Sequence, residues 1–333
     1  MNDVEPRHIA IIHTGAIGDL VQAAPLLAAL RAKWPKARVT LVGRPERGAL
    51  LRMAGLVDAI LDVETAGLWR LAANRGEADA LPRALSEADL VLDFLNVEGT
   101  EAALRARVVQ LKALPPAEWK SSAAEWLLEQ ARAALALPDV SPEPVLALSR
   151  EARDAADRTL ESHGITSAFV AIHPGSGSMK KNWPMARFEQ VATRICREMG
   201  RAVVWLLGPA ERERGPVPRA AEGRTVLDEM PLETVAGVLA SADAYVGNDS
   251  GVTQVAAAVR SPHGRATPPV ALFGPTNARV WGPRGPHVHI VRSQDGTMDA
   301  ISVEQAWSAV RAAIGETSPR EKNKPRVTPA TGD

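Results

Sequence analysis

The chain has 333 residues, of which 46% are hydrophobic and 23% are charged, the proportions of an ordinary globular protein. A chain of this length exceeds what one hydrophobic core usually supports, so two domains are expected. Lys and Arg together number 39, as do Asp and Glu. The resulting zero net charge gives the whole molecule no electrostatic reason to bind nucleic acid.

Cysteine content and hydropathy favour a cytoplasmic protein. The single cysteine, Cys196, excludes an internal disulfide and fits a reducing compartment. The N-terminal sequence MNDVEPRHIAII has acidic residues before a short apolar run, which is not the pattern of a signal peptide. The longest apolar runs, such as AVVWLL at 202–207, fall well short of the roughly 20 residues that a membrane span needs. A peripheral contact with a membrane stays open.

In the first half of the chain, short apolar runs alternate with helical patterns. The predicted strands are His8–Thr14, Arg38–Gly43, Ala59–Val63 and Asp89–Leu95. The predicted helices are Leu20–Lys33, Glu46–Ala54, Glu98–Leu111, Ser122–Leu137 and Arg150–His163. Strands that are apolar throughout and separated by helices indicate a parallel sheet covered on both faces. The Pro-rich stretch LPDVSPEPV at 137–145 breaks regular structure and marks the start of an interdomain region.

A second alternation follows. Its predicted strands are Ala168–His173, Ala202–Leu207, Ala244–Gly247, Pro269–Phe273 and His287–Val291. Its predicted helices are Ala186–Met199, Leu232–Ala240, Gly251–Val259 and Val303–Ile314. Two successive runs of this kind predict an α/β protein with two Rossmann-like domains, at residues 1–160 and 161–314, that face a central cleft. The polar, Pro-rich residues 315–333 have no apolar period and are expected to be disordered.

Ligands of open α/β sheets bind beyond the carboxyl ends of the strands, so the loops that follow strands are the places to look for chemistry. The first is TGAIGD, Thr14–Asp19. Its glycines, Gly15 and Gly18, lack the G-x-G-x-x-G spacing of a dinucleotide site. A tight turn with Asp19 at a helix start explains the pattern. An ionised carboxylate in a cleft can also accept a proton, so a role for Asp19 as a base is compatible with that structural role.

The second loop is HPGSGSMKKNWP, His173–Pro184. Its small residues at 175–177 let the backbone approach a ligand closely. Backbone amides, serine hydroxyls and a lysine such as Lys181 are the usual means of holding a phosphate. The G-K-[ST] order of a Walker A loop is absent. A solvated polar loop is the alternative.

The third loop lies in VGNDSGVTQVAAAV at 246–259, which again reads as strand, turn and helix. Asp249, Ser250 and Gly251 fall where the helix starts, so backbone amides there would point at an anion. Simple capping of the helix is the alternative. The sequence has no H-x-x-x-H pair with acids and no C-x-x-C, which disfavours a metal site, and no G-x-S-x-G, which leaves a hydrolase unsupported. Cys196, Trp183 and Trp281 are interpreted as packing residues.

Five stretches together resemble glycosyltransferase family 9, the ADP-heptose:lipopolysaccharide heptosyltransferases and their relatives. In chain order they are GAIGDLVQAAPLLAALRAKWP, HPGSGSMKKNWPMARF, LLGPAERE, PLETVAGVLASADAYVGNDSG and VALFGPTNARVWGP. The similarity runs from about Ile9 to Val291. It implies a GT-B architecture, with an acceptor-side N-terminal domain and a C-terminal domain that holds a nucleotide sugar. It also implies an inverting reaction with no bound metal and no cofactor besides the nucleotide-sugar donor.

The resemblance assigns roles to individual positions. The family's catalytic aspartate falls on Asp19 and its phosphate-contacting lysine on Lys181. The positions expected to contact the nucleotide sugar are Ser176, Gly177, Glu211, Met230, Asp249, Ser250, Gly251, Gln254, Gly274, Pro275 and Thr276. Family members with heptosyl transfer usually carry His at the position of Gln254, and Gln cannot become cationic near neutral pH. The segment Arg260–Val270 is longer than the usual link to the next strand, which fits a surface loop or a change in specificity.

The preferred interpretation is an inverting glycosyltransferase that moves a sugar, heptose from ADP-heptose, onto a hydroxyl of the lipopolysaccharide core. Such an enzyme would act in the cytoplasm or at the inner face of the cytoplasmic membrane, on a lipid-linked or glycan acceptor. Two alternatives keep the fold: glycosylation of a protein or another glycan, and a nucleotide-sugar-binding or isomerising protein without transfer. An NAD-dependent dehydrogenase is disfavoured because the G-x-G-x-x-G motif is missing.

Overall fold

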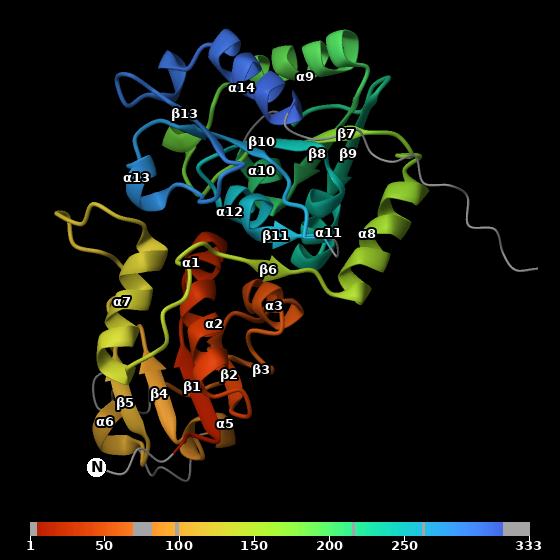
Figure 1. The fold of residues 1–333 in the computed structure, drawn as a ribbon. Helices are drawn as coiled ribbons and strands as arrows, with labels where there is room; N and C mark the ends of the chain where they lie inside the picture. Colours follow the sequence, from red (N-terminus) through yellow and green to blue (C-terminus); the bar gives the residue numbers. More distant parts are fainter. Residues whose placement is uncertain (1–4, 69–81, 97–99, 215–216, 262–263, 316–333) are drawn as a thin grey trace, which may run out of the picture.

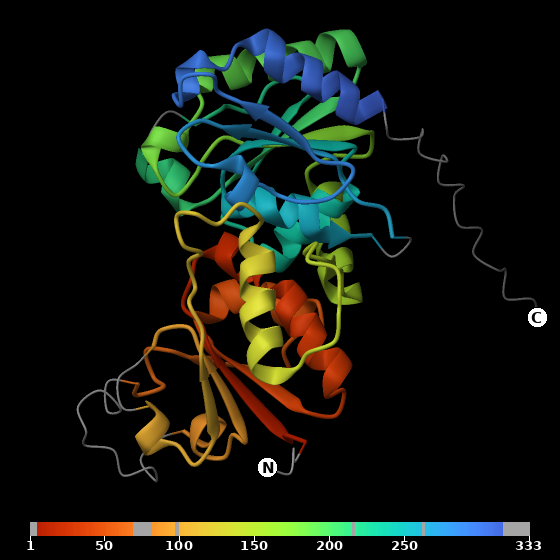
Figure 2. The ribbon, with the colours of Figure 1, turned by 60° about the vertical axis from the view of Figure 1, so that its left-hand side comes forward.

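The computed structural model describes residues 5–68, 82–96, 100–214, 217–261 and 264–315. These residues form two α/β domains stacked end to end (Figures 1 and 2). The N-terminal domain, in red to yellow, lies below the C-terminal domain, in green to blue. The arrangement agrees with the two successive β/α runs predicted from the sequence.

The first domain is built on a five-stranded sheet in which every described pair of strands is parallel. The strand order is β3-β2-β1-β4-β5. The strands are β1 (His8–Ile12), β2 (Arg38–Gly43), β3 (Ala59–Asp62), β4 (Leu90–Asp93) and β5 (Arg107–Gln110). The central strands are buried along nearly their whole length, which explains their continuous apolar sequences.

Helices cover this sheet, and one predicted helix is interrupted. The helices are α1 (Ile17–Gln22), α2 (Ala24–Lys33), α3 (Pro45–Met53), α5 (Arg83–Ser86), α6 (Thr100–Ala103) and α7 (Ala123–Leu135). The prediction of one helix over Leu20–Lys33 is wrong, because Ala23 ends α1 and begins α2. Pro25 cannot donate the backbone hydrogen bond that a continuous helix would require of it.

The predicted helix Glu98–Leu111 is also wrong. Residues 97–99 lie outside the described residues, α6 covers one turn, and Arg107–Gln110 forms β5. Val108 and Val109 are β-branched and favour an extended strand. They pair in parallel with Val91 and Leu92 of β4, so a tertiary partner decides the conformation of a short stretch whose pattern was ambiguous.

The second domain carries a six-stranded parallel sheet in the order β13-β12-β10-β7-β8-β9. The strands are β7 (Phe169–His173), β8 (Ala202–Leu207), β9 (Arg224–Asp228), β10 (Ala244–Asn248), β12 (Pro269–Phe273) and β13 (His289–Arg292). The helices are α8 (Arg150–Ser162), α9 (Met185–Met199), α10 (Pro209–Arg214), α11 (Leu232–Ser241), α12 (Gly251–Ala258), α13 (Ala278–Trp281) and α14 (Val303–Gly315). Single 3-10 turns occur at η2 (Met179–Lys181) and η3 (Met298–Ala300).

Both sheets have the strand order of a doubly wound fold. The first strand of each domain, β1 or β7, lies at the point where the order reverses. A crevice opens at such a switch point, beyond the carboxyl ends of the strands. The loops after β1, β4, β7 and β10 are therefore the loops that the topology places beside a ligand.

The segment that connects the domains is itself part of the structure. β6 (Leu146–Ala147) pairs in parallel with β11 (Val259–Arg260). Arg260 Nη2 lies 2.6 Å from Glu143 Oε1, which adds an ion pair to the same connection. α8 follows and packs on α11, where Gly237 leaves room for Ala156. The domain boundary at 160/161 stays a prediction. Apart from Gly315, the tail predicted to be disordered lies outside the described residues.

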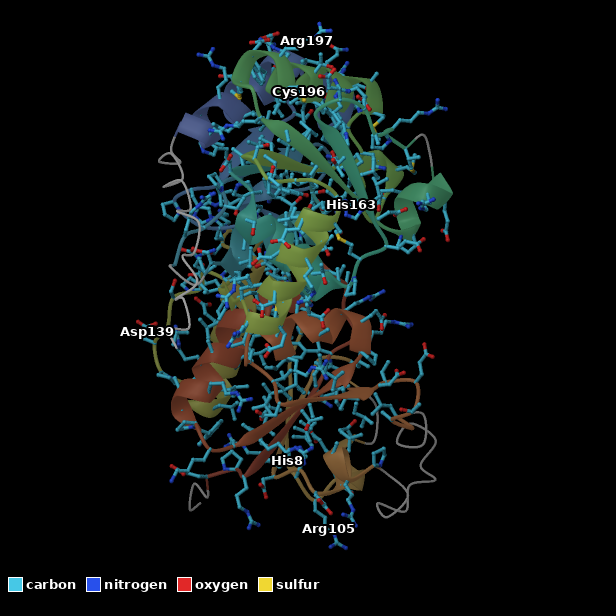
Figure 3. All side chains as sticks on the ribbon, turned by 90° about the vertical axis from the view of Figure 1, so that its right-hand side faces the viewer. His8, Arg105, Asp139, His163, Cys196 and Arg197 are labelled. Carbon is cyan, nitrogen blue, oxygen red and sulfur yellow. The ribbon has the colours of Figure 1, made fainter. Side chains whose placement is uncertain are left out.

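The hydrophobic core is continuous across the domains. One cluster of buried side chains includes β1, α1 and α2 of the first domain together with α11 and α12 of the second. A separate cluster lies under α9 and α14 on the far side of the second sheet. Cys196 lies on α9 in that outer layer, where its Sγ is 3.6 Å from the Gly223 carbonyl oxygen (Figure 3). This position fits the prediction that Cys196 is a packing residue.

Candidate functional site

A cavity of about 960 Å³ lies between the domains. Its walls come from segments that follow strands: after β1 and β2 in the first domain, and after β7, β8, β9 and β10 in the second. Six of the predicted site residues line it: Ser176, Gly177, Glu211, Met230, Ser250 and Gly251. The carboxyl ends of two parallel sheets thus face one space, as the strand orders require.

Asp19 is the third residue of α1, close to the cavity wall formed by Ala16 and Ile17. Its Oδ2 accepts a hydrogen bond from the backbone N–H of Ala16 at 2.8 Å. This bond satisfies a donor that would otherwise be unpaired at the helix start. The structural part of the sequence interpretation, Asp19 as a helix-start residue, is therefore confirmed.

The turn before Asp19 is held from behind by His13. The His13 imidazole is buried, packs against Phe94 at 4.7 Å between ring centroids, and accepts at Nδ1 from the Gly15 N–H at 3.1 Å. Burial lowers the pKa of His13, although the nearby charge of Asp19 acts in the opposite direction. Arg47 of α3 donates to the Gly15 carbonyl at 3.2 Å from the cavity side. The loop that carries Asp19 is therefore fixed on both sides.

The loop after β7 is folded by its own serine. Ser176 Oγ lies 2.7 Å from the Ser178 carbonyl and 2.6 Å from Asn182 Oδ1, and it accepts from the Ser178 N–H at 3.3 Å. Only 6% of Ser176 is exposed, so its hydroxyl acts mainly inside the loop. Gly177 is exposed in the cavity wall, and no atom of the described residues lies within 4 Å of the place where a Cβ would be. Backbone at this point can come close to a ligand.

Lys181 and Asp249 bring the second and third loops together. Lys181 Nζ lies 2.8 Å from Asp249 Oδ2, and about a third of the lysine side chain is exposed. Asn248, which is fully buried, joins the same loops at a second point. It donates to the Pro174 carbonyl at 2.6 Å and accepts from the Trp183 N–H at 3.0 Å. The ammonium group of Lys181 is thereby held at the start of α12.

α12 begins at Gly251 with Ser250 as its cap. Ser250 Oγ accepts from the Thr253 N–H at 3.3 Å. Behind it, Tyr245 OH lies 3.0 Å from Thr253 Oγ1, and burial raises the pKa of Tyr245 well above its ordinary value. The first amides of a helix have no partner inside the helix, so this end attracts an anion. Capping and anion binding are compatible here because Ser250 covers only one of those amides.

His173 and Glu211 face each other in the cavity wall. His173 Nδ1 lies 2.9 Å from the Leu206 carbonyl, so Nδ1 carries the proton and Nε2 is free to accept. His173 Nε2 is 3.9 Å from Glu211 Oε1, while Glu211 Oε2 accepts from the Gly208 N–H at 2.7 Å. Burial lowers the pKa of His173, and the charge of Glu211 offsets part of that effect. Two acceptors side by side suit a ligand with hydroxyl or amino donors.

α1 and α12 meet across the domain interface, where Figure 1 shows the two helices next to each other. A Cβ on Gly251 would lie 2.7 Å from Ile17 Cβ and 3.0 Å from the Gly18 nitrogen. Only glycine allows this approach. Asp19 is therefore on the first turn of one helix and Ser250 caps the other, with the two first turns in contact.

Five predicted residues do not line the cavity, and neither do the two residues predicted to be catalytic. Gln254 lies one turn into α12 and is hydrogen bonded to Gln22 and to the Trp281 carbonyl. Gly274, Pro275 and Thr276 follow β12 outside the cavity lining. Asp249 is ion paired with Lys181, and Asp19 accepts from the Ala16 N–H; Asp19, Lys181 and Asp249 are next to lining residues without lining the cavity themselves. Their roles toward a nucleotide sugar stay predictions.

Sequence reasoning missed several residues of the site. His173 and Gly208 each stand at the end of a strand, in motifs that were quoted for their neighbours. Their position at a carboxyl end was the signal that could have identified them. Gln22 carried no such signal, because its partner Gln254 is 232 residues away in sequence.

The described residues contain neither a candidate metal site nor a candidate membrane span. Among them, no group of three or more His, Cys, Asp or Glu side chains is placed to hold a metal ion. In the same part of the chain, every helix is too short or too polar to cross a membrane.

The relatives of known identity are heptosyltransferases or members of glycosyl transferase family 9. Lipopolysaccharide heptosyltransferase 1 of Pseudomonas aeruginosa is 38% identical over 118 residues, which is 35% of this chain and 31% of that protein. The match thus spans about a third of the relative's length. A glycosyl transferase family 9 structure from Veillonella parvula has a TM-score of 0.73 at 19% identity, covering 93% of this chain and 98% of that one. E. coli heptosyltransferase WaaC with ADP has a TM-score of 0.67 at 18% identity, covering 92% and 99%.

The structural relatives share the GT-B architecture of two Rossmann-like domains, which confirms the predicted fold class. The sequence profile of glycosyltransferase family 9 (heptosyltransferase) matches residues 105–308, more than half of the chain. This profile, together with the architecture, shows that the chain belongs to glycosyltransferase family 9 (heptosyltransferase).

Proposed function

We propose that the chain is an inverting glycosyltransferase that moves heptose from ADP-heptose onto a hydroxyl of a lipopolysaccharide core acceptor. One observation carries the proposal: a carboxylate at the start of α1 and an anion-attracting start of α12 meet beside one interdomain cavity. Such a reaction needs a base that deprotonates the acceptor hydroxyl and a group of hydrogen-bond donors that binds the leaving diphosphate.

Asp19 would act as the general base. It would take the proton of the acceptor hydroxyl while the acceptor oxygen bonds to the anomeric carbon of the sugar. The bond between that carbon and the donor phosphate oxygen would break, and the nucleoside diphosphate would leave with the electron pair. Attack from the face opposite the leaving group inverts the anomeric centre. A positioned base of this kind typically contributes about 10²–10⁴ in rate.

Lys181 and the first amides of α12 would stabilise the charge on the departing diphosphate. The ammonium group and the amides are held in place before reaction, by Asp249, Asn248 and the Ser250 cap. Preorganised donors of this kind stabilise developing charge without having to reorganise. These groups of the chain itself could serve the role that a metal ion serves elsewhere, so we propose a metal-independent reaction.

The donor and acceptor are proposed from the relatives. The Pseudomonas aeruginosa relative is named as a lipopolysaccharide heptosyltransferase, and the E. coli heptosyltransferase structure is described as a complex with ADP. In the cavity wall, the acceptors of Glu211 and His173 suit the hydroxyls of a nucleoside, and Met230 offers an apolar contact. We place the reaction in the cytoplasm, where a lipid-linked acceptor would bring the protein to the inner face of the membrane.

The test combines a donor screen with one variant. In a thermal-shift screen against ADP, UDP, GDP and their sugars, we expect ADP and ADP-heptose to raise the melting temperature most, because specific binding stabilises the folded state. Asp19→Asn should keep that shift and lose transfer by about 10²–10⁴-fold. Full transfer by Asp19→Asn would refute the base. Binding of ADP-sugar without transfer to any glycan by the wild-type protein would favour a binding or isomerising protein instead.

A further inference from the structure

Two buried glutamines connect the domains directly behind the site. Gln22 Nε2 of α1 donates to Gln254 Oε1 of α12 at 3.0 Å, and 3% and 5% of these residues are exposed. Gln22 Oε1 accepts from the Ala124 N–H at 3.1 Å, at the start of α7. Gln254 Nε2 donates to the Trp281 carbonyl at 2.6 Å, at the end of α13. We call this chain of hydrogen bonds, from Ala124 through Gln22 and Gln254 to Trp281, the amide relay.

The amide relay lies one helical turn behind the site. Gln22 follows Asp19 by three residues, and Gln254 follows Gly251 by three residues. Residues three apart lie on the same side of a helix. The side of α1 that carries Asp19 is thus joined to the side of α12 that contacts Gly18. The two helices are in contact twice, at Gly251 and, one turn further along, at the amide relay.

The relay has a definite direction that leaves little room for other arrangements. An amide side chain offers an oxygen that accepts and a nitrogen that donates. In the amide relay, the oxygen of each glutamine accepts from one N–H, and the nitrogen of each glutamine donates to one carbonyl oxygen. A buried amide that loses its partner is disfavoured relative to a paired one, so sliding or opening of this interface would break bonds that buried surroundings cannot replace.

Gln254 stands where the resemblance implies a contact with the nucleotide sugar. Its nitrogen and oxygen are both engaged within the protein, and it does not line the cavity. Within the described part of the chain, Gln22 is hydrogen bonded to Gln254 and Ala124, and neither of these residues lines the cavity. The geometry thus indicates that Gln22 and Gln254 act by positioning other groups of the protein and not by contacting the ligand.

We propose that Gln22 and Gln254 are positioning residues that hold Asp19 at a fixed distance from the phosphate-binding start of α12. The proposal rests on the proposed function, because it assigns Asp19 and the start of α12 to one reaction. In this view the end of the interface at α1 and α12 stays closed.

The experiment compares Gln22→Met, Gln254→Met and the double variant, because Met keeps length and volume while it removes the hydrogen bonds. Displacement of a catalytic group by about 1 Å can cost about 100-fold, so we expect kcat to fall by about 10- to 100-fold in each. KM for the donor and Kd for ADP should stay within about twofold, the signature of an interaction that matters only in the transition state. The double variant should lose no more than the worse single variant, because the two residues act as one unit.

The matched control is Gln130→Met on α7. Gln130 also hydrogen bonds through its amide, to Lys112 and to the Trp126 carbonyl, but its bonds stay within the first domain. We expect its kcat to equal that of the wild type. Additive losses in the double variant would overturn the relay. So would a Gln254→Met variant that loses ADP affinity while Gln22→Met does not, because that result identifies Gln254 as a ligand contact.

A structural measurement separates this proposal from the proposed function. Arg105 and Arg197 lie at opposite ends of the molecule, one in each domain (Figure 3), and both are exposed. Fluorophores at Arg105→Cys and Arg197→Cys, in a Cys196→Ser background, report the interdomain distance by energy transfer. The Met variants should show a broader distance distribution than the wild type and than Gln130→Met. Unchanged distributions would overturn the relay, whereas absence of transfer by the wild type with every donor would overturn only the proposed function.

Discussion

Lys180 and Lys181 are neighbours in η2, yet among the described residues an ion pair is formed by Lys181 and not by Lys180. The two lysines are adjacent in the sequence, and the fold distinguishes them, because the 3-10 turn directs Lys181 toward Asp249 and leaves Lys180 exposed. Two like charges of the same loop therefore have different environments. A pair of single variants can use this difference.

Lys181→Met should weaken ADP binding by about 10- to 100-fold, since a hydrogen bond to a charged group contributes about 1.5–3 kcal/mol. Isothermal titration at moderate salt measures the change. Lys180→Met is the matched control and should bind ADP like the wild type. Equal losses in both variants would mean that the loop attracts the nucleotide by its total charge and that no specific contact is made by Lys181.

Two buried histidines should make stability depend on pH. Burial lowers the pKa of His13 and of His173 in the folded protein, from an ordinary value of 6.5. Below about pH 6.5 the unfolded chain therefore binds more protons than the folded protein, and stability falls as the pH falls. We expect a lower melting temperature at pH 5 than at pH 7.5, with a smaller difference in His173→Asn.

The control for this prediction is His163→Asn, which removes an exposed imidazole at the end of α8 (Figure 3). Its melting temperature should depend on pH as in the wild type. A pH dependence that persists unchanged in His173→Asn would show that other groups cause the acid sensitivity. The affinity for the nucleotide offers a second measure of His173 protonation. Protonated Nε2 carries a hydrogen, so it would donate toward Glu211 and could no longer accept from a ligand.

At the scale of elements, the contact between the starts of α1 and α12 depends on a glycine. Gly251→Ala would place a Cβ within 2.7 Å of Ile17 Cβ and push the two helices apart. We expect a loss of about 1–3 kcal/mol in the free energy of unfolding, the usual cost of overpacking, and a lower kcat. Urea denaturation and a transfer assay measure the two effects.

Gly315→Ala is the matched control for the glycine contact. Gly315 is the last residue of a helix, and a Cβ there would meet no atom of the described residues within 4 Å. This variant should be as stable as the wild type. If Gly251→Ala is equally harmless, α1 and α12 can separate at no cost, and the close approach of the helices has no function.

Element boundaries could be predicted only where local chemistry decides them. The start of β1 at His8 and the start of α12 at Gly251 were predicted because an apolar run and a glycine turn define them, whereas β1 ends at Ile12, two residues before the predicted Thr14. β5 was mistaken for part of a helix, since a short stretch becomes a strand only when β4 lies beside it. The amide relay could not be predicted at all, because hydrogen bonds between residues 232 positions apart leave no local pattern.

At the scale of the whole molecule, two Rossmann-like domains and a cleft could be inferred from alternating strands and helices. What the alternation did not reveal is how the domains are joined. β6 pairs with β11, and buried side chains of α1 and α12 belong to one hydrophobic cluster. The interface that borders the cavity is therefore packed like the interior of a single domain.

The shared cluster of buried side chains has a consequence for the evolution of such enzymes. Both halves of the chain contribute to one cluster of buried side chains, so recombination that exchanges one domain for that of a distant relative would bring together mismatched surfaces at α1 and α12. Exposed residues of the cavity loops, such as Gly177 and Glu229, lie outside that cluster and carry no such constraint. New donors and acceptors are then reached by substitution in these loops, while the two halves are inherited together.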